Sequence, residues 1–144
     1  LQYAEYAGMK AFSAALNHLY VSEPAFWEQD TSWDGFGWCN AEDRDNSVFS
    51  FVRYGKDRKD ALVFVMNFTP MPHENYTLGV PFFTEYREIL NTDSTLYGGD
   101  NRLNRAFLIP KTEAVGEMPY RITVNLPPFG GMIYKPFDAS GKTK

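Results

Sequence analysis

Residues 120–126, Tyr-Arg-Ile-Thr-Val-Asn-Leu, place a large apolar side chain at every second position and a polar one between. This two-residue period is that of a β-strand with one face in a core and the other in solvent. Residues 47–54 alternate too, with Phe49 and Phe51 on one side and smaller residues on the other. Residues 61–66 are continuously apolar, which is typical of a central strand covered on both faces. The chain is therefore predicted to be mainly β.

The remaining predicted strands are short and are separated by turns that contain Gly and Pro. They comprise residues 76–80, 85–91, 107–109 and 132–134. Short strands separated by turns of this kind indicate an antiparallel sandwich or barrel. The last residues, 138–144, are small and polar, and we expect them to form a flexible tail.

The first part of the chain differs from the rest because its apolar period is helical. Apolar residues recur at helical spacing over residues 4–20, at Met9, Phe12, Leu16, Leu19 and Tyr20. Ser22, Glu23 and Pro24 then resemble the start of a second helix, with Ser22 as its cap. Turn-forming residues between 30 and 37 keep this helix short. We expect one long and one short N-terminal helix before the sheet.

Composition excludes several classes of protein. A chain of 144 residues with 44% apolar residues is long enough for one domain with its own core, and it is unlike a disordered segment. Eighteen acidic against 14 basic residues leave a net charge of −4, which argues against a nucleic-acid partner. No apolar run is long enough to cross a membrane.

The residues suited to metal binding or nucleophilic catalysis are few. The single cysteine, Cys39, excludes an internal disulfide and a cysteine-rich zinc site, and His18 and His73 lie far apart in the sequence. Neither histidine is flanked by a nucleophile motif, so we interpret both as surface or packing residues. The acidic residues lie almost all in turns, where bonds to the backbone explain them. The sequence thus predicts no metal, no cofactor and no catalytic centre.

Aromatic residues cluster between positions 26 and 38. This segment contains Phe26, Trp27, Trp33, Phe36 and Trp38, which include all three tryptophans of the chain. Glycine and aspartate residues interrupt the segment, so some of these rings are expected at the surface. An exposed ring beside polar groups is a platform for the apolar face of a sugar. The alternative is that these rings pack the helical segment against the sheet.

Several motifs, in this order and spacing, resemble the C-terminal part of bacterial 1,4-α-glucan (glycogen) branching enzymes of the α-amylase superfamily. The resemblance extends from about residue 8 to residue 135. It rests on Leu16–Tyr20, Ser22–Ala25, Gly35–Trp38, Asn46–Val48, Asn67–Pro70, Arg87–Asp93, Tyr97–Gly99 and Leu126–Pro128. No single motif is specific, but the ordered set is.

The resemblance implies a division of the chain. Residues 1–30 would be the last helical segment of an upstream catalytic barrel, and residues 31–137 a Greek-key β-sandwich of the α-amylase C-terminal type. The chain begins at Leu1 without the pattern of a signal peptide, so we expect a piece of a longer, cytoplasmic protein. The catalytic carboxylates of the family belong to the barrel, and none of their motifs occurs here. The chain alone is therefore expected to be inactive.

The resemblance also implies an α-glucan partner for the parent enzyme, which transfers α-1,4-glucan segments to form α-1,6 branches. Trp38 lies in the family element at the border with the barrel and is the first candidate for glucan contact, followed by Trp33 and Phe36. Two alternatives remain open. The domain could be an autonomous carbohydrate-binding module, or a purely structural domain that binds no ligand. The helix at residues 4–20, detached from its barrel, would need the sandwich or a second chain as a partner.

Overall fold

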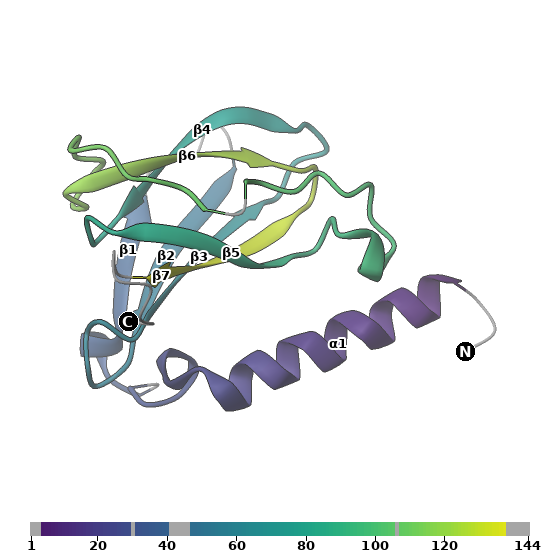
Figure 1. The fold of residues 1–144 in the computed structure, drawn as a ribbon, viewed down its shortest axis with the longest axis horizontal. Coiled ribbons are helices and arrows are strands. Elements are labelled where there is room, and N and C mark those ends of the chain that lie inside the picture. The colour runs from purple at the N-terminus through teal and green to yellow at the C-terminus, as the bar shows by residue number, and fades with distance from the viewer. Residues whose placement is uncertain (1–3, 30, 41–46, 106, 138–144) are drawn as a thin grey trace.

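The alternating segments form two antiparallel sheets in the computed structural model, which describes residues 4–29, 31–40, 47–105 and 107–137 (Figure 1). The larger sheet has the strand order β1-β2-β3-β7-β5, and the smaller one pairs β4 with β6. The strands are β1 (Phe36–Asn40), β2 (Val48–Tyr54), β3 (Ala61–Asn67), β4 (His73–Val80), β5 (Glu85–Asn91), β6 (Tyr120–Leu126) and β7 (Gly131–Phe137). The predicted antiparallel, mainly β fold is confirmed.

The strand pairing shows how the chain moves between the sheets. Strands β2 and β3 pair without interruption, from Val48 opposite Asn67 to Tyr54 opposite Ala61. Strand β7 then lies between β3 and β5, with Ile133 opposite Phe64. Strand β4 contacts β1 although the two belong to different sheets. Strand β4 thus returns to the side of β1 after the consecutive strands β1, β2 and β3.

The main core fills the space between the two sheets (Figure 1). Strand β6 contributes Ile122, Val124 and Leu126, each at most 1% exposed, whereas Thr123 and Asn125 between them face solvent. This is the burial pattern that the alternation of residues 120–126 predicts. Burying one such aliphatic side chain stabilises the fold by about 1.5–3 kcal/mol relative to leaving it exposed.

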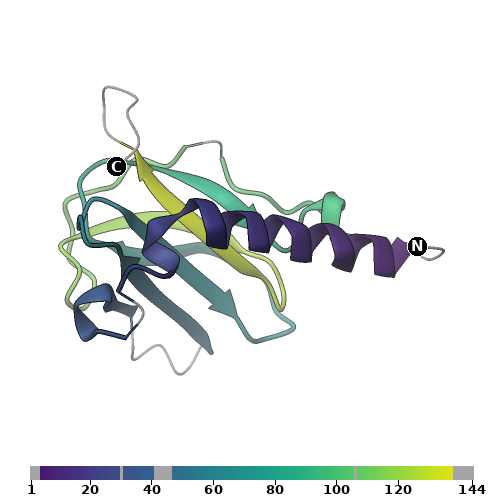
Figure 2. The same cartoon turned by 90° about the horizontal axis from the view of Figure 1, so that it is seen from below.

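Helix α1 (Ala4–Ser22) covers the other face of the five-stranded sheet, so the molecule has three layers (Figures 1 and 2). Leu62, Leu90 and Ile133 are buried beneath the helical segment. The helix packs Phe12, Ala15, Leu16 and Leu19 against this second core. The sandwich therefore supplies the partner that the apolar stripe of the helix requires.

Two predicted members of this stripe do not face the sheet. Met9 is 64% exposed, because the neighbouring Gly8, and not Met9, contacts the loop around Tyr97. A Cβ atom on Gly8 would lie 2.7 Å from the carbonyl oxygen of Tyr97, so the helix approaches this loop as closely as a glycine allows. Tyr20 is 49% exposed, although its ring contacts Phe26 at a centroid distance of 5.7 Å.

Three further expectations need correction. The predicted second helix is a single 3-10 turn, Pro24–Phe26; Ser22 ends α1 and does not cap the turn. Residues 107–109 form no strand, because Leu108 makes only an isolated bridge with Tyr86. Strand β1 was not predicted from the sequence, since the glycine residues before Trp38 indicated a turn. The tail 138–144 lies outside the described residues.

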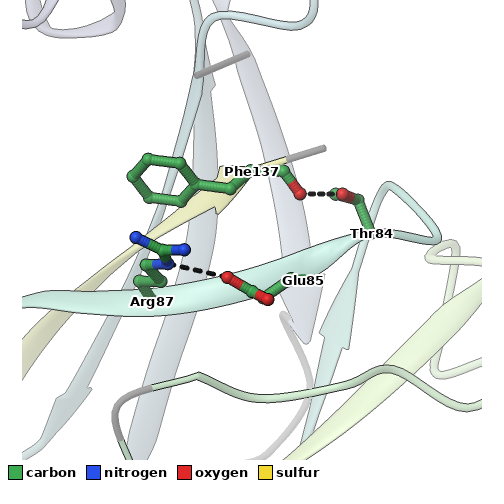
Figure 3. A network of polar contacts seen from close by, with 4 residues as sticks. All are labelled: Thr84, Glu85, Arg87 and Phe137. Atoms are coloured by element: carbon green, nitrogen blue, oxygen red, sulfur yellow. Dashed lines mark hydrogen bonds and ion pairs between the residues drawn. The ribbon is translucent and has the colours of Figure 1, made fainter. Parts of the chain in front are cut away.

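Polar contacts hold the start of β5 to the end of β7 (Figure 3). The hydroxyl of Thr84 donates a hydrogen bond to the carbonyl oxygen of Phe137. Arg87 pairs with Glu85 at 2.7 Å, and its guanidinium carbon lies 4.4 Å from the centroid of the Phe137 ring. Both charged groups are partly exposed, so this pair contributes about 1 kcal/mol or less.

Candidate functional site

The structure brings the three predicted aromatic residues, Trp33, Phe36 and Trp38, together around one surface pocket of about 430 Å³. The remaining lining residues are Thr31, Ser32 and Arg53. The Phe36 ring stands edge-on between the other two, with centroid distances of 5.9 Å to Trp33 and 5.0 Å to Trp38. Trp33 is 84% exposed and Trp38 is 44% exposed, so both indoles offer an open face or edge to a ligand.

A short turn before β1 positions these rings. Trp33–Gly35 forms a 3-10 turn, capped by the Ser32 hydroxyl, which accepts a hydrogen bond from the Asp34 amide at 3.1 Å. A Cβ atom on Gly35 would lie 2.6 Å from the carbonyl oxygen of Gln29, so only glycine fits at the end of this turn. Strand β1 then turns Phe36 and Trp38 to the outer face of the sheet and Cys39 to the inter-sheet core.

Behind the pocket, a row of rings runs across the outer face of the sheet toward α1. Phe36 stacks on Phe51 at 5.4 Å, and Phe51 stacks on Phe64 at 4.9 Å. Phe64 contacts Phe26 edge-on at 5.4 Å, beneath the end of the helix. Offset and edge-on pairs of this kind contribute about 0.5–1.5 kcal/mol each beyond burial. The row fixes the position of Phe36 and thereby that of the pocket.

The other aromatic residues of the predicted cluster have different surroundings. Phe26 is partly buried and belongs to the packing between helix and sheet. Trp27 is 45% exposed and does not line the pocket. The packing interpretation is therefore confirmed for Phe26, whereas Trp33, Phe36 and Trp38 line an open pocket.

Arg53 is a charged lining residue that was not predicted from the sequence. It lies directly opposite Phe36 in the β1–β2 pairing, so its side chain shares the outer face with the rings. The alternation of residues 47–54 could have placed Arg53 on the side of Phe49 and Phe51. Arg53 was missed because strand β1, which lies opposite it and carries Phe36 and Trp38, was not predicted.

The described lining residues of the pocket include no pair of carboxyl groups for glycosyl transfer. Retaining glycoside chemistry needs two carboxyl groups about 5–5.5 Å apart, and no Asp or Glu is among the six described lining residues. Cys39, one position after Trp38, is buried, and burial raises the pKa of its thiol to about 12. The thiol is therefore protonated at neutral pH and is no nucleophile.

Metal-binding clusters and membrane-spanning helices are both lacking in the described part of the chain. No group of three or more His, Cys, Asp or Glu residues there is arranged to hold a metal ion. None of the helices within those ranges is both long and apolar enough to cross a membrane.

Together, the two antiparallel sheets and the helix packed on one of them define a mainly β domain that carries an exposed aromatic pocket. Residues 38–137 match the family described as alpha amylase, C-terminal all-beta domain. This match covers more than half of the chain, and the chain belongs to that family.

Relatives of the chain include bacterial enzymes named 1,4-alpha-glucan branching enzyme GlgB. The chain is 42% identical to the Gloeobacter violaceus protein, over 94% of the chain and 18% of that protein. It is 41% identical to the Pseudomonas putida protein, with the same coverage of both chains. It is 38% identical to the Bacillus subtilis protein, over 92% of the chain and 21% of the relative. The chain thus spans about a fifth of the length of these enzymes.

Proposed function

We propose that this chain is the C-terminal β-domain of a 1,4-α-glucan branching enzyme and that its aromatic pocket contacts the glucan chain. The observation that carries the glucan contact is the convergence of Trp33, Phe36 and Trp38 at one open pocket. The similarity to proteins named as branching enzymes supports an α-glucan as the ligand.

The chemistry of the pocket matches that of a glucose unit. A pyranose ring has an apolar face of C–H groups, which packs on an indole, and an edge of hydroxyl groups. The Thr31 and Ser32 side chains and the Arg53 guanidinium, which line the same pocket, are groups that bond to hydroxyls. Stacking on Trp38 would contribute about 1–2 kcal/mol, the scale of an aromatic contact that also removes apolar area from water.

In the parent enzyme, the catalytic step would belong to the barrel and not to this domain. The parent would cleave an α-1,4 bond through a covalent glycosyl-enzyme and transfer the chain to a 6-hydroxyl group. The domain would hold a stretch of the same glucan at the border of the barrel, in the cytoplasm, without taking part in bond making. The pocket fits this division because its described lining residues include no acid or base for the reaction.

A second role, support of the barrel, is favoured by the outer face of β1 and β2. Phe49 and Phe68 lie on this side at a centroid distance of 5.4 Å, and they are 47% and 55% exposed. Helix α1 packs on the β3, β5 and β7 side of the sheet and leaves these rings in solvent. The catalytic barrel is the partner that we propose for them. An autonomous carbohydrate-binding module would need no such partner.

The activity test uses Trp38→Ala in the full-length branching enzyme that contains this domain. Loss of the stacking contact is expected to lower kcat/KM on amylose about 5–30-fold, the equivalent of about 1–2 kcal/mol. The matched control is Trp27→Ala, which removes an indole of the same type and similar exposure, 45% against 44% for Trp38, that does not line the pocket. Unchanged kinetics for Trp38→Ala would contradict the glucan contact and leave only support of the barrel.

A further inference from the structure

A second pocket, of about 490 Å³, is lined by residues of β6 and of the segment that precedes it. In Figure 1, β6 lies on the side of the sandwich that faces away from α1. The floor of the pocket is the solvent face of β6, formed by Arg121, Thr123 and Asn125. Its wall is formed by the segment that precedes β6, including Arg105 and Lys111. The pocket belongs to the smaller sheet and shares no lining residue with the aromatic pocket.

The charge of this pocket is opposite to that of the whole chain. Arg105, Lys111 and Arg121 line it, and no Asp or Glu is among the lining residues that the structure describes. The chain as a whole carries a net charge of −4. Three cations around one concave surface raise the local concentration of anions.

Two of these cations are held directly opposite one another. Lys111 and Arg121 form an antiparallel bridge, in which each backbone amide donates to the other residue's carbonyl oxygen, at 2.8 and 3.1 Å. Residues opposite in such a pair have Cβ atoms about 4.5–5.5 Å apart, and like charges there are destabilising. Glu113 lies 2.5 Å from Nε of Arg121, which offsets one of the charges. An anion between the two side chains would offset the remaining positive charge.

The polar floor of the pocket is fixed by hydrogen bonds. The Asn75 amide donates to Oδ1 of Asn125 at 2.9 Å, and the Asn125 amide donates to Oδ1 of Asn104 at 2.8 Å. Asn104 in turn donates to the Glu88 carboxylate at 2.7 Å. Because these groups are already ordered, a ligand does not have to order them on binding.

The rim of the pocket is apolar. Phe107 and Ile109 line it and are 54% and 66% exposed. A phosphate ion has no apolar surface that could pack against these side chains, whereas a sugar ring has a C–H face that packs on an aromatic ring. A sugar that carries an anionic group satisfies both the cations and the rim.

We propose that this pocket binds a phosphorylated sugar, with the phosphoryl group among Arg105, Lys111 and Arg121 and the sugar ring against Phe107. Guanidinium and ammonium groups donate charge-assisted hydrogen bonds to phosphoryl oxygens. This site is independent of the proposed glucan contact and would remain if that contact were absent.

The test is calorimetric titration of the 144-residue chain with glucose 6-phosphate, inorganic phosphate and glucose as three separate probes. Glucose 6-phosphate is expected to bind more tightly than inorganic phosphate, and glucose to give no heat at the same concentrations. Lys111→Gln and Arg105→Gln should each weaken glucose 6-phosphate about tenfold, the effect of losing one charged hydrogen bond. Lys59→Gln, an exposed cation in the β2–β3 loop, is the control and should change nothing.

Two further measurements separate the parts of the proposal. Phe107→Ala should weaken glucose 6-phosphate and leave inorganic phosphate unchanged. Lys111→Gln should unfold at the same temperature as the parent chain or higher, because it removes a like-charge pair. Equal binding of glucose and glucose 6-phosphate would overturn the role of the cations. Equal binding of phosphate and glucose 6-phosphate would overturn the sugar contact, and no heat at millimolar glucose 6-phosphate would overturn the site itself.

Discussion

Glu88 accepts hydrogen bonds from three separate residues and joins segments that are distant in the sequence. Its carboxylate oxygens lie 2.9 Å from the Tyr134 hydroxyl, 2.7 Å from Nδ2 of Asn104 and 3.1 Å from Nδ2 of Asn91. Burial, together with the negative charge of Glu88, raises the pKa of Tyr134 well above its usual range, so this hydroxyl is a donor at neutral pH. The carboxylate thus holds the loop around Asn104 to β5 and β7.

Glu88→Gln is expected to lower the free energy of unfolding by about 1–3 kcal/mol, because an amide nitrogen would replace one acceptor among several donors. The control is Glu85→Gln in the same strand, whose partly exposed pair with Arg87 (Figure 3) contributes at most about 1 kcal/mol. Urea unfolding of both variants measures the difference. Equal losses for the two variants would contradict the role given to Glu88.

Stability at alkaline pH depends on buried groups whose pKa is raised, which include Cys39, Tyr86 and Tyr134. Burial raises the pKa of Cys39 from 9.0 to about 12, and it raises the pKa of Tyr86 well above 10.0. The unfolded chain loses these protons at lower pH than the folded chain, so stability is full below about pH 9 and falls as the pH rises. The slope is at most about 1.4 kcal/mol per pH unit for each group.

Urea unfolding between about pH 8 and pH 11 checks this prediction. The parent chain should lose stability above about pH 9 from Cys39 and more steeply above about pH 10 from Tyr86 and Tyr134. Cys39→Ala should lack the first loss, and Tyr86→Phe should show a shallower second loss, because Tyr134 still titrates in that range. Parallel pH profiles for the parent and both variants would show that neither group titrates on unfolding.

Among the elements, α1 shows how far hydrophobic periodicity predicts contacts. The spacing of Phe12, Leu16 and Leu19 identified the buried face of the helix, because core-facing residues must recur every three or four positions. Periodicity could not show that Gly8 takes the contact expected of Met9. That depends on the 3-10 turn Thr95–Tyr97, which is distant in the sequence and lies against the helix.

Gly8→Ala tests this close contact. Alanine is favoured over glycine in a helix by about 1 kcal/mol, so an undocked helix would be stabilised. Here the added Cβ would lie 2.7 Å from the Tyr97 carbonyl oxygen, and we expect a net loss of stability and faster hydrogen exchange in the first half of α1. Ser13→Ala, at an exposed position of the same helix, should be neutral or slightly stabilising. Slower exchange in Gly8→Ala would contradict the packing described.

Strand β1 is the element that could not be predicted from the sequence. Its five residues include Gly37, whose low strand propensity hides the alternation of Phe36 and Trp38. Pairing with β2 overrides this local preference, because Trp38 lies opposite Phe51 in a register that stacks rings on one face. When a strand forms through pairing with its neighbour in this way, its own sequence shows little of the alternation that predicts a strand.

For the whole molecule, the antiparallel fold followed from alternation within single strands, such as residues 120–126. The candidate aromatic residues were also identifiable, because Trp33, Phe36 and Trp38 are close in sequence and the turn between them is short. The cationic pocket was not, since Arg105 and Lys111 are brought to Arg121 only through an isolated bridge that joins the irregular segment before β6 to that strand. The secondary structure of single segments can thus be predicted from the sequence, whereas the contacts between segments are known only from the structure.

The three tryptophans allow the central claim, that the aromatic pocket contacts an α-glucan, to be tested in one spectrum. Trp33 and Trp38 line the pocket, and Trp27 is exposed outside it, so its indole is an internal control. The measurement is an amide-correlation NMR titration of this chain with maltoheptaose, following the indole N–H signals. We predict that the Trp38 and Trp33 signals shift at millimolar or lower ligand while the Trp27 signal does not. Three unmoved indoles at saturating maltoheptaose, in a folded sample, would contradict the claim.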